Sequence, residues 1–151
     1  AILLLIVPLY FILRPSPSLF DHYFDPYQDR YTSRASANEE IKQAFSNYNK
    51  DQYEESLVHF DNYLKVSPSD SQAVFYSGIA HLAAGQTQNA IDQLSTLQQP
   101  DFLFYIQSQW YLALAYIQVN QTEKAKTLLE SLANSDNSFQ KKAGELLQDL
   151  D

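Results

Sequence analysis

The side chains that most often carry chemistry are few in this chain and lie far apart. The 151 residues include no cysteine and three histidines, His22, His59 and His81. Their spacing fits no metal-ligand set, and none of them pairs with a nucleophile in a readable motif. His81 lies in an apolar helical segment, so we expect it to fill space in a core or a groove.

Paired carboxylates are the remaining candidates for acid–base chemistry. Glu39-Glu40 and Glu54-Glu55 stand at the starts of predicted helices, where the positive end of the helix dipole favours negative charge. Three glycines are too few to suggest a phosphate-binding loop. We therefore expect no enzyme, no metal site and no cofactor.

The charge balance argues against nucleic acid as a partner. The chain has 10 basic and 18 acidic residues, a formal net charge of −8. Phosphate binding depends on clustered lysine and arginine, and the sequence contains no basic stripe. The absence of cysteine is compatible with either a reducing or an oxidising compartment.

Small residues recur at a fixed spacing in the helical part of the chain. Two series each have separations of 34 and 35 residues, and the second lies twelve positions after the first: Ala44, Gly78 and Ala113, then Ser56, Ala90 and Ala125. Small residues let two antiparallel helices approach closely, and the bulky residues one turn away fill the seam. The pattern predicts three helix-turn-helix units whose stacking buries a continuous core.

The period of about 34 residues resembles that of the tetratricopeptide repeat family. Leu112-Ala113 followed by Tyr116 fits the family's first-helix motif best, whereas His81 stands where an aromatic residue is usual. The resemblance implies an all-α fold, a right-handed solenoid of three repeats over residues 37–137. A helix at 138–151 would cap its carboxyl end, with Ala143, Leu146, Leu147 and Leu150 on its apolar face.

Capping residues are predicted at the start of most of these helices. The sequence favours two capping boxes and three further caps, at Ser36 with Glu39, Asp51 with Glu54, Ser69, Thr87 and Thr122.

The amino end differs from the repeats in composition. Residues 1–13 are an uncharged apolar run, which is too short to span a bilayer alone and which we interpret as the distal part of a transmembrane anchor. A processed signal segment and a core helix are the alternatives. Residues 14–36 form a Pro/Ser spacer and an aromatic strap. The stretch 19–31 within them resembles the segment that follows the membrane helix in bacterial single-pass proteins with carboxy-terminal tetratricopeptide domains. That resemblance implies a single-pass membrane protein whose carboxy-terminal domain is periplasmic.

The resemblance also places a binding groove on the first helix of each repeat. The family's groove positions are mostly large and apolar here, at Ile41, Phe45, Tyr48, Phe75, Ile79, Leu82, Trp110, Leu114 and Ile117. An apolar groove is normally covered. Its occupant is either the chain itself, through the strap residues Phe20, Tyr23, Phe24 and Tyr27 or the terminal helix, or an apolar segment of a partner protein.

The function implied is a membrane-anchored adaptor or scaffold that binds envelope or membrane proteins and performs no catalysis. Asn38, Gln72 and Gln107 occupy inner positions where lysine or arginine would be needed to clamp an acidic peptide terminus. Two alternatives remain: the extracytoplasmic half of a transmembrane regulator of the sigma-factor-linked type, which the resemblance implies, and a chaperone-like protein of the secretion machinery.

Overall fold

A computed structural model of the chain describes residues 18–28 and 38–150. This part of the chain is all-α, as predicted. It contains the helices α2 (Leu19–Tyr23), α3 (Glu39–Tyr48), α4 (Tyr53–Val66), α5 (Ser71–Ala83), α6 (Thr87–Leu94), α7 (Tyr105–Gln118), α8 (Thr122–Ala133) and α9 (Gln140–Asp149), and the short 3-10 helix η1 (Ser95–Leu97). None of these helices is both long enough and apolar enough to cross a membrane. The predicted anchor at 1–13 lies outside the described residues, as do residues 14–17 and 29–37 of the predicted spacer and strap.

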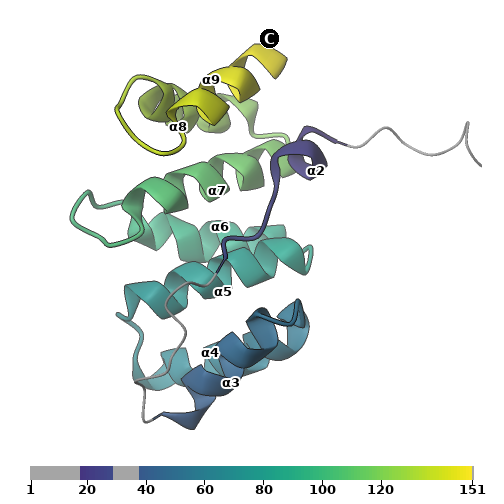
Figure 1. The fold of residues 1–151 in the computed structure, drawn as a ribbon, viewed down its shortest axis with the longest axis vertical. Helices are drawn as coiled ribbons and strands as arrows, with labels where there is room; N and C mark the ends of the chain where they lie inside the picture. Colours follow the sequence, from purple (N-terminus) through teal and green to yellow (C-terminus); the bar gives the residue numbers. More distant parts are fainter. Residues whose placement is uncertain (1–17, 29–37, 151) are drawn as a thin grey trace, which may run out of the picture.

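From α3 to α9 the helices pack in chain order, each against the next. Figure 1 shows them as an elongated stack in which α3 and α4 form one end and α8 and α9 the other. The short helix α2 precedes all of them in the sequence, yet it packs against α7, deep in the stack. The arrangement of sequential pairs is consistent with the predicted repeat array.

The small residues identified by spacing lie at the helix contacts. Five of them are fully buried, namely Ala44, Ser56, Ala90, Ala113 and Ala125. At the sixth, Gly78, an added Cβ atom would stand only 2.8 Å from two side-chain carbons of Leu94. Ser56 also donates a hydrogen bond of 2.9 Å to the carbonyl oxygen of Ala44, which joins α4 to α3.

The turns inside the three helical pairs provide another series with the same spacing. Asp51, Gly85 and Asn120 have φ angles of 59°, 72° and 58°, in the left-handed region. A glutamine follows each of them, and its backbone N–H donates to a carbonyl five residues back, at 3.0 Å for Gln52 and 2.8 Å for Gln86 and Gln121. The three turns, which are separated by 34 and 35 residues, therefore share one conformation.

Most of the predicted helix caps are wrong. The side chains that cap α3 and α5 belong to Asn38 and Asp70, rather than to Ser36, which lies outside the described residues, or Ser69. The residues before α4, α6 and α8 are the turn glutamines, which make no side-chain cap. Asp51 therefore belongs to the turn, and Thr87 and Thr122 are the first helical residues. The shared left-handed turn sets where these helices begin, so a side-chain cap is not required.

A helix, α9, lies within the segment 138–151 where the sequence predicts a capping helix. Ala143 and Leu146 of α9 are completely buried, and Leu147 and the residue after the helix, Leu150, are partly buried. The other face of the helix carries glutamine, lysine, glutamate and aspartate. An amphipathic last helix of this kind closes the core against water.

Candidate protein-interaction groove

The predicted groove residues lie in the interior of the stack. Eight of the nine are buried, and Ile117 is half-buried. Phe75 stacks on Phe104 with ring centroids 4.5 Å apart, and Phe45 contacts Phe60 and Tyr76 edge-on. These rings pack together as a core rather than as an open surface.

The chain's own amino-terminal segment covers part of this aromatic core. We call its described part, residues 18–28, the strap. Ser18 and Asp21 form a capping box that starts α2; the backbone of Phe24 is extended, and residues 24–28 belong to no helix or strand. In Figure 1 the strap leaves α2 beside α7 and runs along the face of the stack towards α5.

Aromatic rings hold the strap in place. Tyr27 contacts four rings edge-on at centroid distances of 5.3 to 6.4 Å, those of Phe75, Tyr76, Phe104 and Tyr111. Phe24 packs on Tyr111 and stacks on Phe20, which is buried. Tyr23 lies edge-on to Trp110, whose ring is stacked with Phe139.

Tyrosine hydroxyls also bind the strap through its backbone. The hydroxyl of Tyr48, on α3, donates to the carbonyl oxygen of Tyr27 at 2.8 Å. The hydroxyl of Tyr111, on α7, donates to the carbonyl oxygen of Asp25 at 2.6 Å. Because both acceptors are backbone atoms, these bonds do not depend on the side chains of the strap. We call the six side chains that contact the rings of Tyr23 and Tyr27 or bind these carbonyls the strap seat: Tyr48, Phe75, Tyr76, Phe104, Trp110 and Tyr111.

A third tyrosine ties the strap to the last helix. The hydroxyl of Tyr23 donates to Asp149 of α9 at 2.6 Å. This hydrogen bond to a carboxylate is the main reason that the pKa of Tyr23 is raised to about 12. Burial is the main cause for Tyr111, whose pKa is also raised. Both hydroxyls therefore remain protonated donors at neutral pH.

Sequence reasoning found three members of the strap seat and missed three. Tyr48, Phe75 and Trp110 are groove positions of the repeat, whereas Tyr76, Phe104 and Tyr111 are not. Two of the missed residues are the chain neighbours of predicted ones. The third belongs to the aromatic segment 102–105, a signal that could have identified it.

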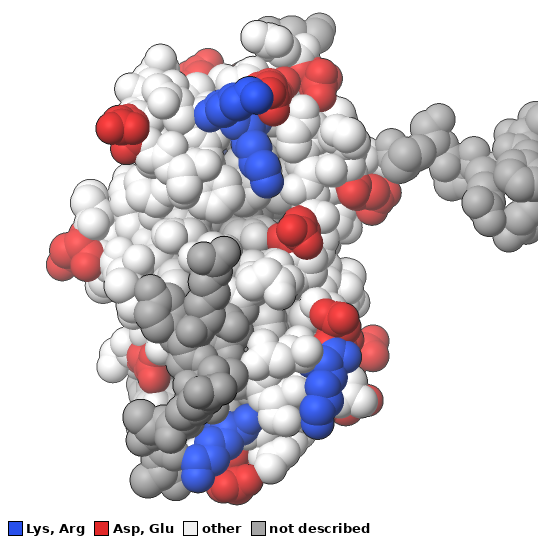
Figure 2. Space-filling model, viewed as in Figure 1, with Lys and Arg blue, Asp and Glu red and all other residues white. Residues whose placement is uncertain are grey.

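The face that carries the strap has little charge. Figure 2 shows acidic groups scattered mainly round its margin and few basic ones, and the described residues form no basic patch there. An open cavity of about 350 Å³ remains beside the strap, lined by Asp25, Pro26, Tyr27, Gln28, Tyr111, Phe139 and Lys142.

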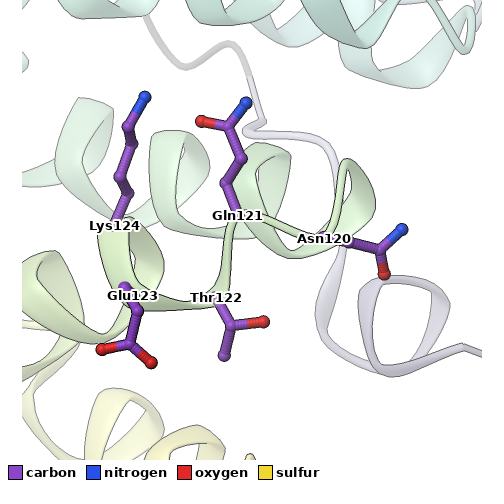
Figure 3. A pocket seen from close by; sticks show the side chains of 5 residues that line it. All are labelled: Asn120, Gln121, Thr122, Glu123 and Lys124. Carbon is purple, nitrogen blue, oxygen red and sulfur yellow. The ribbon is translucent and has the colours of Figure 1, made fainter.

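Another cavity, of about 430 Å³, lies at the turn between α7 and α8. Figure 3 shows that its lining side chains do not converge: Gln121 and Lys124 point to one side of the turn, Thr122 and Glu123 to the opposite side.

Within the described residues, no three histidine, cysteine, aspartate or glutamate side chains group as a metal site would require. His81 is buried and its Nδ1 is hydrogen-bonded to Gln86 at 2.9 Å.

Comparison with known proteins identifies one repeat directly. The tetratricopeptide repeat family matches residues 107–136, which include most of α7 and all of α8. No curated protein and no solved structure is significantly similar to the chain. The match falls on the repeat whose residues fit the motif best, and the comparisons found no catalytic family. A tetratricopeptide repeat indicates a module for protein–protein interaction.

Proposed function

We propose that this chain is a non-catalytic adaptor that binds a segment of another protein at the strap seat. The observation that carries the proposal is the way the strap is held. Two tyrosine hydroxyls bind carbonyl oxygens two residues apart on an extended chain, and four rings surround one aromatic side chain. Backbone hydrogen bonds combined with side-chain pockets are a general mode of peptide recognition.

Membrane anchoring is part of the same proposal. It is supported by the apolar run at 1–13 and by the proline-containing spacer after it. We propose that the repeat domain lies on the periplasmic side and meets membrane or envelope proteins there. Extraction of cell membranes with carbonate tests the anchor, because an integral protein stays in the pellet and a chain lacking residues 1–13 would be released.

Photo-crosslinking from two exposed positions tests the binding face. Lys142 lines the cavity beside the strap and is exposed, and Val58 is an exposed residue of α4. A photoreactive residue at either position leaves the core intact. We expect a discrete protein adduct from position 142 in native membranes and none from position 58. Equal adducts from both positions, or adducts from position 58 alone, would exclude the strap face as the binding surface.

Alanine substitutions in the aromatic core would not be a clean test of binding. Phe75 and Trp110 are 0% and 2% exposed, so replacing either with alanine is expected to cost about 3–5 kcal/mol of folding stability. Tyr48→Phe and Tyr111→Phe keep the rings and remove only the hydroxyl donors. Each should cost about 0.5–1.5 kcal/mol. We expect the double variant to stay folded and to lose most of the adduct at position 142.

A further inference from the structure

We propose that the partner segment has the chemistry of the strap itself: an aromatic residue, then aspartate, proline and a second aromatic residue, in extended conformation. This inference rests on the proposed function and adds to it the class of peptide that the strap seat accepts. The strap supplies that sequence as Phe24-Asp25-Pro26-Tyr27. In this proposal the strap is an internal occupant, and the partner takes its place.

The spacing of the two aromatic residues follows from the rings that receive them. Tyr111 contacts both Phe24 and Tyr27, at 6.1 and 6.4 Å between centroids. Phe75 approaches Tyr27 more closely, at 5.3 Å. Edge-to-face contacts of this kind favour aromatic side chains over aliphatic ones. A partner with aromatic residues three positions apart can satisfy the same rings.

The two residues between the aromatics suit the backbone contacts. The carbonyl oxygens of Asp25 and Tyr27 accept hydrogen bonds from Tyr111 and Tyr48. Proline between them keeps the chain extended and has no N–H group that would need a partner. The Asp25 side chain is exposed, so its charge stays in water while its backbone is bound.

The aspartates of the strap make no ion pair, and the strap does not fill its site. Within the described part of the chain, no lysine or arginine forms an ion pair with Asp21 or Asp25. Phe24 and Tyr27 are only half-buried, and the 350 Å³ cavity lies alongside. A partner segment can therefore add contacts that the strap lacks, which is the condition for displacing it.

A labelled synthetic peptide of residues 18–28 tests the proposal by fluorescence anisotropy. The proteins are the full chain and its Tyr27→Ala variant, in which the internal occupant is weakened and the strap seat is intact. We expect the peptide to bind the variant at least about ten-fold more tightly than the wild-type chain. The same peptide with Phe24 and Tyr27 replaced by alanine should not bind.

A matched pair of substitutions on α7 shows whether binding occurs at the strap seat. In the Tyr27→Ala background, Tyr111→Phe should weaken peptide binding by about three- to ten-fold, the effect of one hydrogen bond. Tyr105→Phe is the control, because the hydroxyl of Tyr105 is bound by Gln109 of its own helix rather than by a strap carbonyl. If Tyr27→Ala loses helical content, Phe24→Ala serves as the weakened strap.

Several results would overturn the inference. A folded variant that does not bind the peptide, or that binds the alanine peptide equally well, would show that the strap seat does not select this chemistry. The adaptor proposal would still stand if position 142 gives its adduct. Concentration-dependent dimers of the wild-type chain that are lost in the Tyr27→Ala variant would identify the occupant as the strap of a second copy instead.

Discussion

At Gly78 the side chain of Leu94 occupies the space that a Cβ atom would need. Although alanine is the better helix former by about 1 kcal/mol, a methyl group 2.8 Å from Leu94 must displace it. We therefore expect Gly78→Ala to lower the free energy of unfolding by about 1–3 kcal/mol. Gly144→Ala is the control, because nothing lies within 4 Å of that position and the change should stabilise α9. Urea unfolding would contradict this account if the two variants had the same midpoint.

His81 gives the stack a dependence on pH. Burial is the main cause that lowers its pKa below the usual 6.5, although a hydrogen bond to the amide oxygen of Gln86 and the charge of Asp61 act in the opposite direction. As the pH falls below 6.5 the unfolded chain gains a proton more readily than the folded one, so stability decreases. Above 6.5 this group has no effect. We expect the wild-type chain to lose more stability between pH 7 and pH 5 than His81→Gln, measured by urea unfolding. Equal losses would show that His81 plays no part, since His22 and His59 are common to both proteins.

The sequence identified the close-packed residues more reliably than the strap seat. Small residues such as Ala44 and Ala113 recur because every repeat needs the same close approach, so spacing alone reveals them. Tyr76 and Tyr111 also lie 35 residues apart, at equivalent places in the second and third repeats, but they are not among the groove positions of the family. Phe104 lies between two helices and belongs to no spaced series, because its place is set by the path of a segment that is remote in the sequence.

Among the elements, the three turns determine where the second helix of each pair begins. Gly85 adopts a φ of 72°, and its two counterparts are aspartate and asparagine at similar angles. Residues with a Cβ pay about 1–2 kcal/mol in this region, and asparagine and aspartate tolerate it best. We therefore expect Gly85→Ala to destabilise the protein by about 1–2 kcal/mol and Gly85→Asn to cost clearly less. Thermal unfolding of the two variants measures the difference, and equal melting temperatures would count against the turn argument.

The turns also explain why helix existence was predictable and helix starts were not. The apolar periodicity of each helix is carried by many residues and is read easily. A start depends on one or two backbone angles, and Asp51, which looks like a cap, adopts the left-handed angle instead. Asp70 does cap α5, accepting from the backbone N–H groups of Gln72 and Ala73. Serine and aspartate stand side by side there, so the sequence alone left the choice open.

For the molecule as a whole, Trp110 reports whether the strap is seated. It is the single tryptophan of the chain and is 2% exposed, with Tyr23 at one side and Phe139 stacked on it. We expect Tyr23→Ala to shift its fluorescence to the red and to increase quenching by acrylamide. Tyr116→Ala is the control, since that ring lies beneath Lys124. An unchanged spectrum in Tyr23→Ala would mean that the strap does not shield the indole.

The path of the strap could be anticipated only in outline. A dense group of aromatic residues outside the repeats predicts a partner surface, because such clusters seldom stay in water. Which ring each of Tyr23, Phe24 and Tyr27 contacts depends on where α2 begins and ends. The helix is five residues long and starts after the Ser18 cap, and periodicity reveals neither its start nor its end.

The reach of the strap has a consequence for how the stack opens. In a linear array each unit is supported only by its neighbours, so the outermost units fray first. Here Tyr48 holds the strap at α3, and Tyr23 attaches it to α9 at the opposite end. Because α3 and α9 both bind the strap, neither helix can detach without losing a contact to it. We therefore expect fluctuations at the two ends to be coupled through the strap.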